Sequence, residues 1–307
     1  MICILALIAF GILGIFSATH RQLAKEAFDC VFRRITLRPC NSGFDQKMRG
    51  MIVGKILNKS PKSARFVNKY FEIISWMFIA LFVISSIYVA IGGYNYYLYG
   101  NCNGPNEDGF CIFDPLGDNS KLSAVENEES CLAEPPNPGQ LTLENIDLSL
   151  FPTYNRNAEN TVVFIGCYGC PYTIDAYPTI KKLANRDDVN FIFAHLVVKE
   201  DTAYLSNILN CVNELDEDKF LEFNDKLFNL NGNALQDENE ILKVVEKIGL
   251  DRAAVEQCSN LNETIAISNT QALEIQKTGV YGTPTVFIND EAVVGPKPYR
   301  VYTRLLN

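Results

Sequence analysis

The chain has 307 residues, of which 48% are hydrophobic and 21% are charged, so it can bury enough apolar surface for one or two folded domains. This composition excludes a disordered or collagen-like chain. The net charge of -9 argues against nucleic-acid binding by the whole chain, although the charge is unevenly distributed. Residues 20–70 carry twelve Lys and Arg against three acidic residues, so the rest of the chain is strongly acidic.

Two long segments without charged residues predict membrane-spanning helices. The first covers residues 1–19, and the second covers residues 73–98 and has aromatic residues at both ends. A helix of about 20 apolar residues crosses the hydrocarbon layer, and aromatic side chains are typical of its two interfaces. We expect the first segment to be a retained span. A cleaved signal peptide is the alternative, but basic residues follow its apolar run instead of preceding it.

The basic segment between the two apolar stretches predicts the orientation of the chain. Lys and Arg near membrane ends lie mostly on the cytoplasmic side, so we expect residues 20–70 inside and everything after about residue 99 outside. Cys30 would then be a reduced thiol. Apolar residues at helical spacing among the basic residues of 47–59 indicate a helix on anionic headgroups, with RNA binding as the alternative. We therefore predict a two-pass protein of the cell membrane that contacts the lipid bilayer and no nucleic acid.

Residues 101–144 form an acidic, Pro-rich linker in this prediction, with little of the apolar periodicity of a domain. We expect a tether of limited order, whose proline-rich end holds a globular head away from the bilayer. Cys102 and Cys111 flank a short Gly/Pro loop and could close it as a disulfide. Cys131 is near enough in sequence to replace either partner, so the pairing stays open.

A pair of cysteines separated by two residues follows a predicted buried strand. Residues 161–166 are rich in β-branched side chains, and Cys167-Tyr168-Gly169-Cys170 comes directly after them. A helix to about residue 185 and a strand over residues 189–198 complete a βαβ unit. We expect the first cysteine at the helix start, where unpaired N–H groups and the helix dipole favour a thiolate. The second would lie one turn on, where it can close or resolve a disulfide.

A zinc half-site is the competing interpretation of this cysteine pair. Zinc would require a second pair of cysteines or matching histidines, and the chain has only two histidines, His20 and His195. His20 lies at the predicted membrane border. His195 lies inside the predicted strand, where a packed residue is more common than a ligand or a base. We therefore expect no metal site.

A second motif lies more than a hundred residues later in the chain. It reads Gly-Thr-Pro-Thr-Val-Phe-Ile-Asn over residues 282–289 and is followed by a turn and another short apolar run. Together with the CxxC pair and a final helix from about Pro298, it resembles the cis-proline hairpin of DsbA-family thiol-disulfide oxidoreductases. The resemblance covers residues 145–307. It implies an α/β thioredoxin fold with an inserted helical subdomain, which would be the helical segment 201–277.

The resemblance implies a role for each matched position. Cys167 would be the exposed nucleophile and Cys170 the buried resolving thiol, with Tyr168-Gly169 between them on the substrate side. Pro284 would be the cis-proline that offers backbone groups to an extended substrate, and Thr283 before it would tune the redox behaviour. An ordinary proline at the start of a strand is the alternative for Pro284.

Two departures from the family pattern limit what carries over. Thr161 stands where many relatives keep a buried acid, so proton removal from the resolving thiol needs water or another group. Tyr168-Gly169 lacks the histidine of the strongest oxidants, which leaves the redox potential open. Some relatives carry a second disulfide in the helical subdomain, so Cys211 and Cys258 are candidates for a structural bridge. A regulatory redox pair is the alternative for these two cysteines.

These observations predict a membrane-anchored thiol-disulfide oxidoreductase that acts outside the cytoplasm, in the oxidase, reductase or isomerase direction. Its partners would be protein substrates with thiols or disulfides and a membrane redox partner for recycling. No haem, flavin or nicotinamide motif is present, and we expect no cofactor. One alternative is a non-catalytic thioredoxin-fold module that binds a partner, or Cu or Zn, through its two cysteines. Another is a protein whose membrane region, residues 1–100, carries the function.

Overall fold

The computed structural model describes residues 17–36, 43–107, 109–121, 123–124, 141–155, 157–197 and 202–307, together with the isolated positions 7, 13 and 38. The chain divides into two compact units, Met1–Ala90 and Ile91–Asn307. Of the predicted first span, residues 1–19, only positions 7, 13 and 17–19 are among the described residues.

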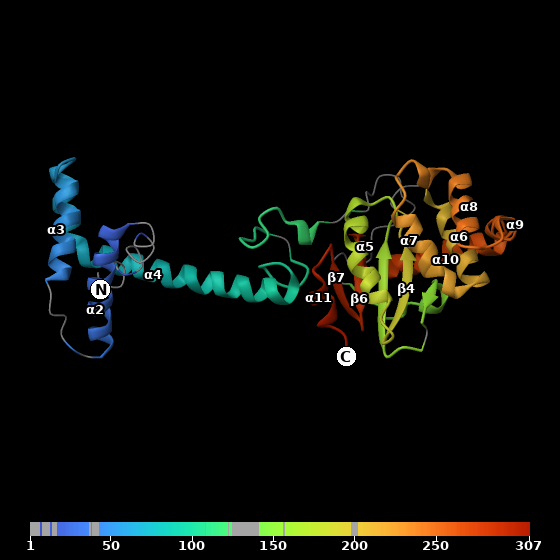
Figure 1. Ribbon diagram of the computed structural model, residues 1–307, viewed down its shortest axis with the longest axis horizontal. Helices are drawn as coiled ribbons and strands as arrows, with labels where there is room; N and C mark the ends of the chain where they lie inside the picture. Colours follow the sequence, from blue (N-terminus) through green and yellow to red (C-terminus); the bar gives the residue numbers. More distant parts are fainter. Residues whose placement is uncertain are drawn as a thin grey trace. The chain divides into compact units, whose positions relative to one another are not determined.

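The first unit is helical (Figure 1). α2 (Ala18–Ile35) and α3 (Phe44–Leu57) carry basic residues, and α4 (Pro61–Tyr99) continues beyond this unit. Proline suits the first position of α4 because the N–H group that it lacks would have no partner there. Among the described residues, α4 is the one helix long and apolar enough to cross a membrane. The prediction of two spans is thus supported for one segment only.

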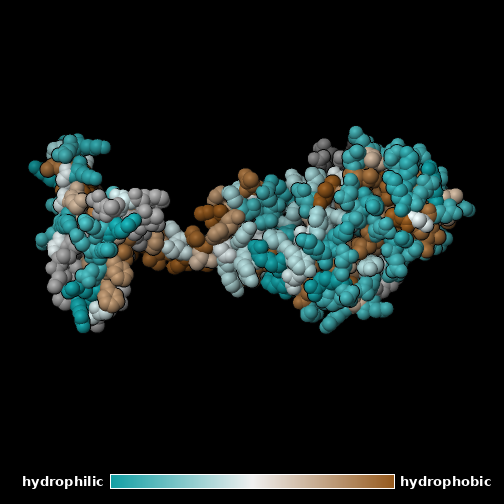
Figure 2. Space-filling view, in the orientation of Figure 1, coloured by the Kyte–Doolittle hydropathy of each residue, from teal (hydrophilic) through white to brown (hydrophobic). Residues whose placement is uncertain are grey.

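Two observations on the first unit bear on the membrane prediction. Large apolar side chains such as Ile73, Phe78 and Ile87 are exposed along α4, and a lipid environment accounts for such a surface (Figure 2). The prediction that Cys30 is a reduced thiol is wrong, because the structure records it as disulfide-bonded. Charge asymmetry does not reveal which thiols the fold brings within bonding distance. A bonded Cys30 is at odds with a reducing compartment, so the orientation stays a prediction.

The second unit is built on a five-stranded sheet with the order β2–β4–β3–β6–β7. β3 and β4 run parallel and are joined by α5 (Pro171–Ala184), and the other neighbouring strands are antiparallel. β6 and β7 form the predicted hairpin. The strands are β2 (Thr153–Tyr154), β3 (Asn160–Gly166), β4 (Val189–His195), β6 (Thr285–Ile288) and β7 (Glu291–Val294).

The segment predicted as a helical insertion, residues 201–277, is helical where it is described, from residue 202 on. Asp216, Asp237 and Asp251 cap three of its helices, because each side chain accepts at least one hydrogen bond from an N–H group of the first turn. The insertion and the C-terminal helix α11 (Tyr299–Thr303) complete the fold. The inserted helices are α6 (Tyr204–Leu215), α7 (Glu217–Phe228), α8 (Glu238–Lys247), α9 (Arg252–Ser259) and α10 (Asn262–Lys277).

Apolar side chains fill both faces of the sheet. Alternate residues of a strand point to opposite faces, so Phe164 of β3 packs in one cluster and Ile165 packs in the other. The larger cluster joins the sheet to α5 and the inserted helices, and the smaller one includes Ile275 of α10. Burial on both faces accounts for the nearly continuous apolar sequence of β3 and β4.

The segment after α4 packs on the sheet of the second unit, which differs from the loose tether predicted for residues 101–144. The Asn106 side chain donates to the carbonyl of Ala292 at 2.8 Å and accepts from the N–H of Val294 at 2.9 Å. An edge strand such as β7 offers unpaired backbone groups of this kind, which composition alone does not reveal. Farther along, β1 (Ser123–Ala124) pairs antiparallel with β5 (Gly282–Thr283). Residues 125–140, with Cys131, lie outside the described residues.

Candidate functional site

The CxxC pair lies between the end of β3 and the start of α5, beside the loop that contains Pro284. The Cys170 sulfur donates a hydrogen bond to the carbonyl oxygen of Thr283 at 3.5 Å. The Thr283–Pro284 peptide bond is cis. The fold therefore brings together two motifs that are 113 residues apart in the sequence.

The second cysteine, not the first, stands at the start of the helix. α5 begins at Pro171, and Cys170 is its N-cap residue. The Cys170 sulfur accepts a hydrogen bond from the N–H of Thr173 at 3.4 Å, while the Cys170 N–H donates to the carbonyl of Cys167 at 3.1 Å. The prediction placed Cys167 at the helix start, but proline favours the first helical position, so the helix begins after the second cysteine.

Gly166 allows α5 to approach the end of β3 closely. A Cβ atom at this position would lie 2.8 Å from the Cγ2 atom of Thr173, which is too close for any side chain. The sequence marks Gly166 only as the end of a strand, so its importance for the site was missed. A glycine directly before a CxxC pair is the signal that could have identified it.

Both cysteines of the pair are buried, and neither forms a disulfide in this structure. Only 1% of the surface of Cys167 is exposed, against 3% for Cys170. The prediction of an exposed nucleophile is therefore wrong for this conformation. The motif predicts which residues react, but only the tertiary fold decides how deeply they are buried.

Tyr168 points into the core instead of toward a substrate. Its side chain is fully buried, and its hydroxyl donates a hydrogen bond to Oδ1 of Asn224 at 2.6 Å. Its ring packs against Phe228 of α7, with the ring centroids 4.7 Å apart. Burial raises the pKa of Tyr168 well above its ordinary value, so the hydroxyl stays protonated and serves as a donor. Of the two central residues, only Gly169 is partly exposed.

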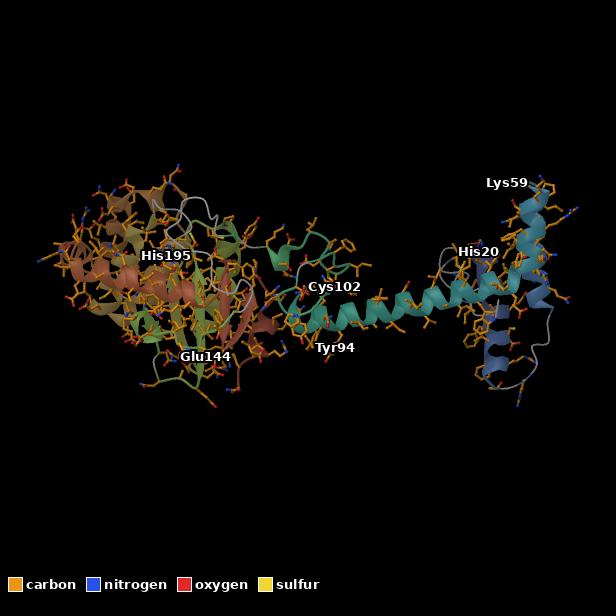
Figure 3. The ribbon with its side chains drawn as sticks, turned by 180° about the vertical axis from the view of Figure 1, so that it is seen from behind. His20, Lys59, Tyr94, Cys102, Glu144 and His195 are labelled. Carbon is orange, nitrogen blue, oxygen red and sulfur yellow. A yellow bond between two sulfur atoms is a disulfide. The ribbon has the colours of Figure 1, made fainter. Side chains whose placement is uncertain are left out.

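His195, which is labelled in Figure 3, is the last residue of β4. The rings of His195 and Tyr168 are in contact, with centroids 4.9 Å apart, and Nδ1 of His195 is 2.9 Å from the hydroxyl oxygen of Ser206. Burial lowers the pKa of His195 to about 3, so the imidazole is neutral at physiological pH. No local pattern predicted that Asn224 of the insertion would contact Tyr168 of the CxxC pair, or that Ser206 would contact His195.

We expect acid to destabilise the fold through His195. Its pKa is 6.5 in an unfolded chain and about 3 in the folded protein, so between these values the unfolded state binds the extra proton. The stabilisation is complete above about pH 6.5 and is lost as the pH falls, with about 2 kcal/mol lost at pH 5. Chemical unfolding at pH 7 and pH 5 measures this loss. His195→Gln should lack it, and an equal pH dependence in both proteins would contradict the assignment.

Two disulfides among the described residues of the second unit lie away from the CxxC pair in the sequence. Cys211 is bonded to Cys258, which joins α6 to α9, and Cys102 is bonded to Cys111 in the segment after α4.

In the described ranges no cluster of three or more potential metal ligands is present. A metal at this site would therefore have to bind through Cys167 and Cys170.

Residues 168–307 match the family of DSBA-like thioredoxin domains. This part of the chain is similar to a DsbA-like thioredoxin domain. The match begins one residue after Cys167 and covers the helical insertion and the Thr283–Pro284 loop. No curated protein matches the chain.

Three solved structures illustrate the similarity of this DsbA-like domain to known proteins. The thiol-disulfide exchange protein alpha-DsbA2 from Wolbachia pipientis is 24% identical, covers 51% of this chain and 85% of its own, and has a TM-score of 0.46. Oxidised BdbD from Bacillus subtilis is 20% identical, with coverages of 55% and 95% and a TM-score of 0.46. The catalytic domain of Proteus mirabilis ScsC is 22% identical, with coverages of 53% and 92% and a TM-score of 0.46. At these values the fold assignment depends on the strand order and the family match.

Proposed function

We propose that the protein is a membrane-anchored thiol-disulfide oxidoreductase that exchanges disulfides with extracytoplasmic proteins through Cys167 and Cys170. The observation that carries the proposal is the hydrogen bond from the Cys170 sulfur to Thr283, beside the cis peptide bond of Pro284. The DsbA-like domain supports the same chemistry. The long apolar helix α4 supports an anchor in the bilayer.

The exchange needs only sulfur chemistry and two proton transfers. In the oxidising direction, a substrate thiolate attacks the Cys167 sulfur of the Cys167–Cys170 disulfide, and Cys170 leaves as a thiolate. A second substrate thiolate then attacks the substrate sulfur of this mixed disulfide and expels Cys167. The substrate leaves with a new disulfide, and its two electrons remain on the reduced cysteine pair. The same steps in reverse reduce a substrate, and a membrane redox partner would restore the starting state.

The experiment that tests this proposal is multiple-turnover oxidation of a reduced, unfolded protein by the full chain in nanodiscs. Glutathione disulfide serves as the terminal oxidant. Formation of many substrate disulfides per chain supports the proposal. Stoichiometric binding of Cu(I) or Zn(II) through the two thiols, with no turnover under any redox condition, would favour a binding module instead.

The substrate-binding edge of the proposed site is occupied by the chain itself. Extended peptides bind by adding a strand to a sheet edge, and β5 is the strand directly before Pro284. β1 already pairs there, with Ser123 opposite Thr283 and Ala124 opposite Gly282. A substrate that adds at this edge must therefore displace β1.

We expect that weakening β1 improves substrate binding. Ser123→Pro combined with Ala124→Pro removes both backbone donors of β1. The KM for an extended substrate should fall by about fivefold to tenfold, because more molecules are open for binding, while kcat stays unchanged. Steady-state kinetics measure both constants. Ser123→Ala, which keeps its N–H, is the matched control, and an unchanged KM in the double variant would show that β1 does not compete with substrate.

A further inference from the structure

A group of exposed apolar side chains lies on the loop formed by residues 109–116, which we call the apolar loop. Phe110 is 79% exposed, Ile112 is 62% exposed and Leu116 is 75% exposed. Figure 2 shows hydrophobic residues gathered on this part of the second unit. Exposed apolar groups of this size commonly mark a surface that contacts a membrane or another protein.

The apolar loop is held in shape by a disulfide and by its own backbone. Cys111 is bonded to Cys102, and the N–H of Asp114 donates to the carbonyl of Cys111 at 3.2 Å. The Asp114 carboxylate accepts hydrogen bonds from the N–H groups of Asp118 and Asn119, at 3.0 Å and 2.9 Å. The Asp114 carboxylate therefore has its hydrogen-bond partners in the neighbouring backbone, while the apolar side chains on either side of it are exposed.

The apolar loop packs against the last turns of α4. The Phe113 ring lies 3.4 Å from the position that a Cβ atom of Gly93 would occupy, and it stacks on Tyr96 with the ring centroids 5.7 Å apart. Cys102 makes a similar approach to Gly92, at 3.5 Å. Two adjacent glycines leave the space for this contact. Figure 3 labels Cys102 and Tyr94 at this end of the helix.

The contact with Gly92 and Gly93 places the apolar loop at the membrane boundary. The uncharged part of α4 begins at Ile73. At a rise of about 1.5 Å per residue, about 20 residues cross the hydrocarbon layer, which ends near these two glycines. Residues 94–99 include four tyrosines, as an interface favours. The exposed side chains of the apolar loop therefore lie where headgroups meet acyl chains.

We propose that Phe110, Ile112 and Leu116 insert into the interface of the bilayer that α4 crosses. This inference depends on the membrane anchor of the proposed function. Lipid is the expected occupant because Phe113 of the apolar loop packs on Gly93 and Tyr96, at the end of the helix that the proposed function places in the bilayer. Asp118 at the end of the loop is paired with Lys121 at 2.6 Å, so its charge is compensated near the headgroups. With the helix as one attachment and the loop as a second, the DsbA-like domain cannot rotate freely about α4.

Tryptophan fluorescence in nanodiscs tests the insertion. The chain has one tryptophan, so Trp76→Phe provides a silent background for Phe110→Trp or Leu116→Trp. The full chain is reconstituted in phosphatidylcholine nanodiscs with ordinary or brominated acyl chains, because bromine quenches tryptophan only at close range. Leu261→Trp is the matched control, since Leu261 is 49% exposed and lies between α9 and α10, far from residues 91–99 (Figure 1).

We expect brominated lipid to reduce the emission of tryptophan at positions 110 and 116 and to leave position 261 unchanged. The native Trp76 reports on the anchor separately. Quenching of Trp76 without quenching at positions 110 and 116 would overturn the insertion and leave the anchor in place. A blue-shifted but unquenched emission at both loop positions would mean that protein covers the loop, which also overturns the proposal. Absence of quenching at Trp76 would remove the anchor itself.

Discussion

Cys167→Ser is expected to reduce catalysed disulfide exchange to the rate measured without the protein. A serine hydroxyl neither attacks a disulfide nor forms one with Cys170, so both the mixed disulfide and the oxidised pair are lost. Cys170 suits the role of the resolving thiol, because it is the N-cap residue of α5 and its sulfur lies between α5 and the Pro284 loop. Oxidation of a reduced protein, followed by trapping of its remaining thiols, measures the effect.

Cys170→Ser separates attack from resolution. Its Cys167 thiolate still attacks a substrate disulfide, but no second thiol releases the product, so a covalent complex accumulates on a non-reducing gel. The double variant Cys167→Ser/Cys170→Ser should form no such complex, which controls for the other cysteines of the chain. Full turnover by Cys167→Ser would place the chemistry on a different pair of thiols and refute the proposed function.

Removal of the Cys211–Cys258 bridge should give the largest loss of stability. The two cysteines are 47 residues apart, and a loop of this length contributes about 4 kcal/mol in the chain-entropy model. Cys211→Ala/Cys258→Ala should lower the free energy of unfolding by about this amount, because Cys211 is fully buried and the bridge joins α6 to α9. Denaturant unfolding of the full chain measures the difference.

The shorter bridge provides the matched comparison. Cys102 and Cys111 are separated by 9 residues, so Cys102→Ala/Cys111→Ala should cost about 2.5 kcal/mol in the same model. Both variants should keep their exchange activity at temperatures where they stay folded. If removal of Cys211 and Cys258 abolished activity but left stability unchanged, these cysteines would be a regulatory redox pair and not a structural bridge.

Local patterns predicted most elements of the DsbA-like domain. The apolar run before Cys167 became β3, and the predicted strand from Val189 became β4, because fully buried strands need apolar residues on both faces. The insertion was predicted as helical, and its aspartate caps can also be seen in the sequence. The predicted second span became α4, although the helix begins earlier, at Pro61.

These local patterns did not predict the contacts between residues far apart in the sequence. Cys167 was expected to be exposed and Tyr168 to face a substrate, yet both are buried. Tyr168 packs against Asn224 and Phe228 of the inserted helix α7. The segment after α4 was expected to be a loose tether, but Asn106 joins it to β7. A polar, proline-rich composition predicts little order on its own. It contains no information about the backbone groups that an edge strand elsewhere offers.

The amino-acid sequence alone was enough to predict the proposed chemistry, because a CxxC pair between a strand and a helix is a local feature of residue type and spacing. It also determined the apolar helix, since hydrophobic length is a local property. Only the tertiary structure decided that the Cys170 sulfur meets Thr283, that β1 covers the edge beside it, and that the apolar loop packs on Gly93. Each of these three contacts depends on residues that are far apart in the sequence or on backbone groups. A local sequence pattern shows neither long-range neighbours nor free backbone groups.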